Sequence, residues 1–231
     1  MVLNQKMIDS NGYQVALFPL ESFIITQRDD ESYSHEPTHY WATDYQAFEY
    51  TSGSETELGT GNVLYRHEYY APVDMVCVGM DLNNASILWR SVNKVHLANN
   101  TIDYLILLFY HDNSVHAGDY SIGDVILQGE VIGHTGTYGD SGSSVADHVH
   151  MESGYGENWT RVYQAPYWGH INLDYALHNY DAMFGNDSIC YGIPSFPDKY
   201  PWKTFEGGLV PKKRGFPWYI TARKRRQHLN Y

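Results

Sequence analysis

The sequence predicts a β-dominated (α+β) fold built on antiparallel sheet. Helix patterns are scarce in the first 160 residues, where short runs rich in Val, Ile, Tyr and Phe are separated by Gly, Asn, Asp and Pro. The 231 residues are 43% hydrophobic and 18% charged, which is typical of a globular chain that buries its own core. These observations favour a folded β-rich body over disorder or a helical bundle.

Six segments have strand character. They are, in chain order, residues 23–26, 41–50, 71–80, 86–91, 104–110 and 149–153. Asn83 and Asn84 suit a hairpin turn between two of them, and residues 133–144 are predicted to form a long Gly/Ser loop. The longest apolar run, residues 104–110, is shorter than the roughly 20 residues that cross a bilayer, so no membrane partner is expected.

The C-terminal third departs from the strand pattern. Residues 171–184 are the best helix candidate, with Asn172 as the N-cap, and residues 192–217 are rich in proline and glycine, as in an extended linker. We therefore expect a domain over residues 1–160, an aromatic and partly helical extension with a linker over 161–211, and a basic aromatic tail over 212–231.

Charge is distributed unevenly. The chain has 15 basic and 27 acidic residues, yet residues 212–231 hold seven bases and no acid, which leaves a net charge of −19 on residues 1–211. An acidic body of this size would repel a phosphate backbone, which argues against nucleic acid as a partner. The tail is better suited to docking on another protein or on a cell wall.

The two cysteines and the first residues give no sign of a secreted, disulfide-linked protein. Cys77 and Cys190 are predicted to be free thiols, because a disulfide-framed secreted fold would carry many more, and the absence of CxxC excludes a cysteine zinc site. The first 14 residues have no apolar core, so no secretory signal is expected.

The segment from Asp147 to Glu152 is the clearest candidate for chemistry. Alternate residues of a strand share a face, so His148, His150 and Glu152 should project together. Two imidazoles on one face suit a metal ligand beside an acid–base group; the alternative is a pair of surface histidines on a polar face.

Two further segments could complete such a site. Residues 33–44 place His35 and His39 before Asp44, and one His and the Asp from here with a His from residues 148–150 would make the three protein ligands of a catalytic zinc ion. Alone, Asp44 could simply cap a turn. His111 ends the apolar strand over 104–110 and could be a hydrogen-bonded core residue or part of the site.

Together these segments resemble one family, from about residue 23 to residue 154. The chain looks like an M23 zinc metallopeptidase of the lysostaphin and LytM type, which cuts peptide bonds in bacterial peptidoglycan. The matching segments, in the family's order, are residues 24–27 (IITQ), 71–76 (APVDMV), 108–111 (LFYH), 123–136 (GDVILQGEVIGHTG) and 148–152 (HVHME).

The resemblance implies a role for each matching position. It implies Asp44 and His150 as zinc ligands and His111 with His148 as the catalytic pair. His35 is preferred as the remaining ligand, with His39 as the alternative; they stand nine and five residues before Asp44, and neither spacing is the family's usual one.

The groove around the metal is also expected to follow the family. Glu152 is expected to orient a neighbouring histidine or, alternatively, to be an exposed strand carboxylate. Gly136, Ser141 and Ser143 are expected along the substrate groove, because small residues let an extended peptide approach the backbone closely.

The function that the resemblance implies is zinc-dependent cleavage of peptidoglycan peptides during phage entry or host lysis. The alternative is a non-catalytic tail protein of a phage that keeps an M23-like, antiparallel β-sheet fold. Expected partners are the peptidoglycan peptide and, through the tail, other phage tail proteins. The expected location is the virion tail, or the host cytoplasm before action on the wall.

One motif points to another class of enzyme. Residues 139–142 (GDSG) match the nucleophile loop of chymotrypsin-like serine proteases. Such a site also needs a histidine that reaches the serine, and no histidine here stands in that family's upstream motif. A flexible loop is the simpler interpretation.

Overall fold

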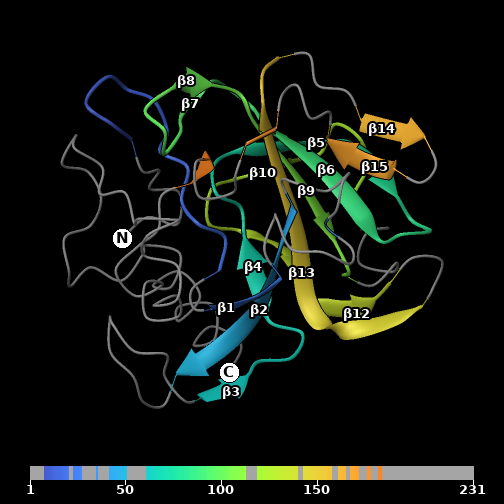
Figure 1. Ribbon diagram of the computed structural model, residues 1–231. Helices are drawn as coiled ribbons and strands as arrows, with labels where there is room; N and C mark the ends of the chain where they lie inside the picture. Colours follow the sequence, from blue (N-terminus) through green and yellow to red (C-terminus); the bar gives the residue numbers. More distant parts are fainter. Residues whose placement is uncertain are drawn as a thin grey trace, which may run out of the picture.

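The computed structural model describes residues 8–20, 23–27, 35, 42–50, 61–112, 119–139, 143–157, 161–164, 167–171, 176–177 and 182–183 (Figure 1). Strand pairs between these residues are antiparallel, so the predicted β-dominated, antiparallel fold is confirmed. No helix among the described residues is long and apolar enough to cross a membrane.

One large sheet dominates the described chain. Its path runs β1-β2-β13-β9-β6-β5-β10, so the longest strand, β13, lies between β2 and β9. The bounds on this path are β1 Phe23–Gln27, β2 Ala42–Tyr50, β5 Met75–Asp81, β6 Ser86–Ser91, β9 Leu105–Tyr110, β10 Val125–Ile126 and β13 Ser144–Tyr155. Three short strands join it from the side: β3 Gly61–Val63 on β2, and β12 Gly136–Tyr138 and β16 Ala176–Leu177 on β13.

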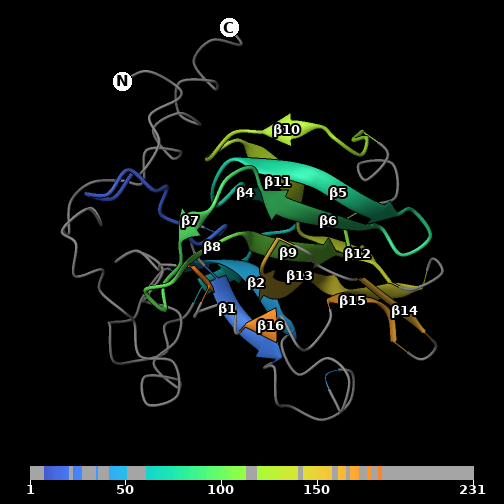
Figure 2. The same ribbon diagram turned by 90° about the horizontal axis from the view of Figure 1, so that it is seen from above.

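The remaining strands form two-stranded ladders. β4 Glu68–Tyr70 pairs with β11 Val131–His134, β7 Val95–His96 with β8 Ile102–Asp103, and β14 Arg161–Gln164 with β15 Tyr167–Ile171. Seen from above, β14 and β15 lie at one end of the sheet and β7 with β8 at the other (Figure 2).

The predicted hairpin lies between β5 and β6. Both oxygens of Asp81 organise the turn, because one accepts the backbone N–H of Asn83 and the other the side-chain amide of Asn84. Ala85 completes the turn with a φ of 46°, in the left-handed region.

The two faces of the sheet bury different side chains. One face belongs to the main core, which includes Tyr45, Leu107, Phe109, Val149 and Met151, all at most 2% exposed. Burying such side chains is worth roughly 1.5–3 kcal/mol each, which makes this face the principal source of stability.

A second layer covers the main core. Phe18 stacks on Phe23 with ring centroids 4.6 Å apart, and Tyr69 lies against Phe109 at 4.8 Å. The segment over residues 15–20 and the β4–β11 ladder therefore close one side of the sheet.

The opposite face carries a smaller apolar cluster of Leu88, Ile106, Leu108 and Tyr110. Tyr110 lies beside His150 across the β9–β13 ladder, so this cluster ends where the polar residues begin. The candidate site therefore lies on the face opposite the main core.

Two predictions about local structure are wrong. A single helix over 171–184 is contradicted because Ile171 ends β15 and residues 176–177 form β16, which pairs with Ser153 and Gly154 of β13; within this range Ala182 is helical. Pairing with a central strand outweighs a weak helical periodicity. Residues 133–144 are not one long loop, since β11 ends at residue 134 and β12 occupies 136–138.

Candidate metal centre

The register of the central strands brings the candidate ligands together. His150 of β13 faces Asp44 of β2 directly across the ladder, and Tyr110 of β9 lies on its other side. Directly opposed residues on one face of an antiparallel pair have neighbouring side chains. The interpretation of Asp44 as a turn cap is wrong, because the residue lies within β2.

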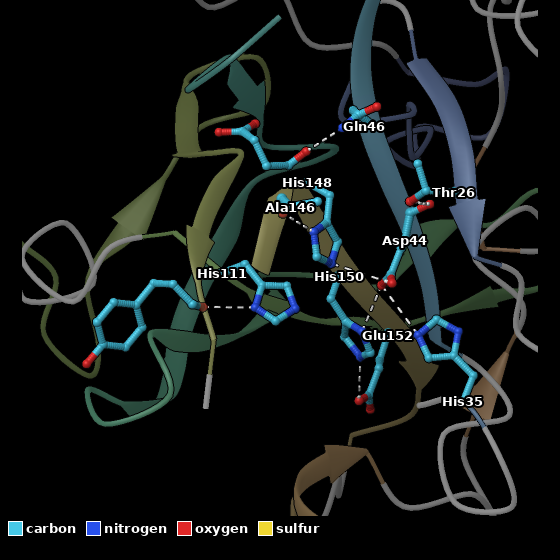
Figure 3. Close-up of polar contacts among 11 residues, drawn as sticks. Thr26, His35, Asp44, Gln46, His111, Ala146, His148, His150 and Glu152 are labelled. Atoms are coloured by element: carbon cyan, nitrogen blue, oxygen red, sulfur yellow. Dashed lines mark hydrogen bonds and ion pairs between the residues drawn. The ribbon is translucent and has the colours of Figure 1, made fainter. Parts of the chain in front are cut away.

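His35 is brought to the same point. Its side chain is fully buried, and its Nε2 lies 3.3 Å from His150 Nδ1 and 3.4 Å from Asp44 Oδ1 (Figure 3). His150 Nδ1 lies 2.9 Å from the same carboxylate oxygen. Three candidate ligand atoms thus converge, two from residues 35–44 and one from a residue more than 100 positions later.

This geometry fits a tetrahedral zinc ion. Bonds of about 2.0–2.1 Å to a tetrahedral ion place neighbouring ligand atoms about 3.3–3.4 Å apart. The two separations that involve His35 have that length, and the Asp44–His150 separation is 0.5 Å shorter than the longer of them. Two nitrogens and one carboxylate oxygen form a donor set typical of catalytic zinc.

Glu152 supports His150 from the other side of the ring. Its Oε1 lies 3.4 Å from His150 Nε2, while Nδ1 points toward Asp44 and His35. A metal-binding histidine usually gives its second ring N–H to a carboxylate in this way. Glu152 is 3% exposed, so the interpretation as an exposed strand carboxylate is wrong.

His148 and His111 lie next to the three ligand atoms, and each has one ring nitrogen bound to the backbone. The Nδ1 of His148 donates to Ala146 O at 2.6 Å, and that of His111 donates to Tyr138 O at 2.9 Å. These bonds favour the tautomers in which both Nε2 atoms are basic. The Nε2 of His148 lies 3.5 Å from Asp44 Oδ2, and the two rings lie 4.4 Å apart between centroids (Figure 3).

The carboxylates of Asp44 and Glu152 stabilise a positive charge between them. Burial alone would raise the pKa of Asp44, but hydrogen bonds from His150 and His35 hold that pKa far below its usual range. Burial alone would lower the pKa of His150, but the carboxylates of Asp44 and Glu152 raise it to about 10. A proton supplies the positive charge in the metal-free protein, and a bound divalent cation would supply it instead.

His111 is tuned in the opposite direction. Burial, with the nearby charges of His148 and His150, lowers the pKa of His111 to about 3. Its ring is therefore neutral at pH 7 and presents an uncharged Nε2. His148 and His150 are 9% and 7% exposed, so the interpretation as surface histidines is wrong.

Two of the three predicted groove residues, Gly136 and Ser143, lie among the described residues. Gly136 is buried, and a Cβ at this position would lie 2.0 Å from the carbonyl oxygen of His111. Ser143 is exposed where β13 begins. Ser141 and the alternative ligand His39 lie outside the described residues, as does Cys190, while Cys77 is a buried free thiol. That Gly136 and Ser143 line a groove stays a prediction.

Sequence reasoning missed a polar network beside the site. Its members are Arg66, Asp112, Thr135 and Asp147. The signal was present in the sequence, because an aspartate directly follows His111 and another directly precedes His148.

Comparison with known proteins gives a distant phage relative. No protein-family model matches the chain. The chain is 28% identical over 196 residues to Morphogenesis protein 1 of Bacillus phage B103, an alignment that covers 84% of this chain and 46% of the relative. The chain thus spans about half the length of this curated relative, and its candidate metal centre lies in a sequence similar to that of a phage morphogenesis protein.

Proposed function

We propose that this chain is part of a phage structural protein and carries a zinc-dependent endopeptidase site for peptidoglycan peptides. The observation that carries the proposal is the convergence of His35, Asp44 and His150 at tetrahedral ligand spacing. Two histidines with available Nε2 atoms lie beside that cluster, which is more than a structural metal site requires.

The chemistry would be metal-assisted amide hydrolysis. Zinc held by these ligands would polarise the scissile carbonyl and lower the pKa of a bound water to about 7. His148 holds a basic Nε2 near Asp44, in position to accept a proton and deliver it to the leaving amine. His111 stays neutral because of burial, and its Nδ1–H is bound to Tyr138 O, so its basic Nε2 would accept a hydrogen bond from the attacking water.

The relative supports the phage part of the proposal. Its name denotes a morphogenesis protein, which is consistent with a place in the virion and with contacts to other phage proteins. A virion component that meets the cell wall at entry would have peptidoglycan as its substrate, and the basic tail over residues 212–231 would serve docking.

A second function rests on the same comparison. The name of the relative fits a non-catalytic structural protein more directly than it fits an enzyme. In that case the histidine cluster would bind a structural metal ion or none, and the neighbouring pair His111 and His148 would have no substrate.

Zinc content and wall hydrolysis separate the two functions. Purified protein should contain one zinc per chain by mass spectrometry and reduce the turbidity of a peptidoglycan suspension, and both properties should disappear on chelation. His150→Ala should lose both, because a ligand is removed from the centre. Ile122→Ala is the control, since Ile122 is exposed in the segment before β10 and should leave both properties unchanged.

Each outcome has a definite consequence. Zinc-loaded protein that hydrolyses no wall preparation from any host would leave the structural function as the conclusion. Full hydrolysis by His150→Ala would show that the ligand set is wrong.

A further inference from the structure

The two histidines beside the ligand cluster each have a buried aspartate as a chain neighbour. Asp112 follows His111 and Asp147 precedes His148, and these aspartates are 4% and 3% exposed. Buried carboxylates must be compensated by hydrogen bonds or by an opposite charge. Their partners therefore determine where the two adjacent imidazoles are held.

Arg66 contacts both aspartates. Its Nη1 lies 2.7 Å from Asp112 Oδ1, and its backbone N–H donates to Asp147 Oδ2 at 3.1 Å. The same Nη1 donates to the carbonyl oxygen of Thr135 at 3.0 Å. One residue of the segment between β3 and β4 thus joins the chain beyond β9 to β13 and to the residue between β11 and β12.

Thr135 closes the network. Its hydroxyl donates to Asp147 Oδ1 at 2.6 Å and accepts the backbone N–H of His67 at 3.0 Å. The second oxygen of Asp112 accepts the backbone N–H of His134 at 2.8 Å. All four carboxylate oxygens of the two aspartates are therefore engaged.

The backbone is strained at the two ends of this network. Arg66 has a φ of 51° and His111 a φ of 77°, although neither is glycine. Such conformations persist where the surroundings over-determine them, and they concentrate at functional sites. Gly136 packs on the carbonyl oxygen of His111 and on Arg66 Nη1, where a Cβ would approach to 2.0 and 2.9 Å.

We propose that Arg66 is a positioning residue that sets the separation of His111 and His148, with its side chain on Asp112 and its backbone N–H on Asp147. This inference rests on the proposed peptidase function. The contacts of Arg66 in the described structure go to Asp112, Thr135 and Asp147 and not to the three candidate ligands. Placement of the proton-transferring pair is thus separable from metal binding.

The first test is Arg66→Met, which keeps the length of the side chain and removes its charge and donors. Zinc content should stay at the wild-type value, while kcat falls by about 10- to 100-fold with little change in KM, since small misplacements of catalytic groups have effects of this size. Arg90→Met is the matched control, because Arg90 packs over Tyr104. The control should retain wild-type kcat.

A spectroscopic measurement makes the test independent of turnover. Long-range proton–nitrogen spectra of the imidazoles in zinc-loaded protein should show His111 displaced in Arg66→Met, with His35 and His150 unchanged. His148 should move less, because the backbone N–H of residue 66 still donates to Asp147. The nuclear Overhauser contact between the rings of His111 and His148 should weaken. If the wild-type protein hydrolyses nothing, these ring signals still test the positioning role.

The aspartates supply the second set of variants, which also serves if Arg66→Met does not fold. Asp147→Asn should displace the signal of His148 and lower kcat, and Asp112→Asn should do the same for His111. The double variant Arg66→Met/Asp112→Asn should lower kcat by less than the product of the two single fold-changes, because both substitutions remove the same contact between Arg66 and Asp112. Folded single variants with unmoved histidine signals and wild-type kcat would overturn the proposal.

Discussion

Glu152 shows how one side chain can set the properties of a candidate metal ligand, His150. It approaches His150 from the side opposite to Asp44, so the imidazole lies between two carboxylates. The carboxylate of Glu152 therefore fixes which ring nitrogen of His150 faces the cluster and increases the basicity of that nitrogen.

We expect Glu152→Gln to keep the fold and to weaken zinc binding by about 10- to 100-fold. The neutral amide oxygen is a weaker acceptor for the ring N–H of His150 than the carboxylate, so the other ring nitrogen becomes less basic. Competition with a chromophoric chelator measures the affinity. Glu157→Gln, an exposed position just beyond the same strand, is the control and should bind zinc normally. Unchanged affinity in Glu152→Gln would remove the supporting role of this carboxylate.

Burial makes the thiol of Cys77 unreactive toward alkylating reagents. Its side chain is buried in the main core, and this burial raises the pKa of the thiol. In a Cys190→Ala background, Cys77 is the single thiol, and we expect no alkylation by iodoacetamide at pH 8 until the protein is unfolded in urea. Rapid labelling of the folded protein would contradict the burial of this residue.

At the scale of elements, β12 and the adjoining end of β13 determine where His111 and His148 lie. β12 pairs with β13 through Gly136 opposite His148, while the backbone of Gly136 also contacts His111. The strand therefore acts as a spacer between the two histidines, and only glycine leaves room for the carbonyl oxygen of His111.

Gly136→Ala should consequently displace His111 and reduce hydrolysis by about 100-fold, while zinc content stays constant because no ligand contacts β12 in the described structure. Zinc analysis and wall turbidity on the same sample measure both quantities. Thr137→Ala, at the exposed position of the same strand, provides the control. Equal loss in both variants would indicate a general effect on β12 rather than contact with His111.

At the scale of the whole molecule, Asp9 attaches the N-terminal segment to the layer that covers the main core. The carboxylate of Asp9 accepts the backbone N–H groups of Asn11 and Tyr13 and lies 2.8 Å from His96 Nδ1 on β7. Burial alone would raise the pKa of Asp9, but these hydrogen bonds lower it. The residues that follow this turn, over 15–20, cover the main core.

This attachment predicts a pH dependence of stability. A carboxyl group with a lowered pKa in the folded state stabilises the protein above its unfolded pKa of about 3.9, and the contribution is lost as pH falls through the folded value. Asp9→Asn should lower the free energy of unfolding at pH 7 by about 1–3 kcal/mol, measured by urea titration. The difference from wild type should shrink below pH 3.

Asp103→Asn is the control for this measurement, because Asp103 forms a partly exposed pair with Lys94 at 3.6 Å. Exposed pairs contribute about 0–1 kcal/mol. A pH-independent difference between Asp9→Asn and wild type would mean that the charge of Asp9 does not act in this way.

Strand content was predictable where the pattern was long. The six predicted segments correspond to β1, β2, β5, β6, β9 and β13, because runs of β-branched and aromatic residues bounded by turn residues have few other stable forms. The two- to four-residue strands, such as β4, β7 and β10–β12, were not predicted. Their existence depends on pairing with distant segments, which leaves no local periodicity to detect.

The sequence by itself determined which residues of β13 share a face, because side-chain alternation follows from the geometry of any strand. His148, His150 and Glu152 therefore project together whatever the rest of the chain does. Only the tertiary structure decided that Asp44 lies opposite His150, that His35 reaches both, and that Arg66 joins the aspartates next to His111 and His148. Those relations come from strand register and from contacts between remote segments, which are properties of packing and not of local sequence.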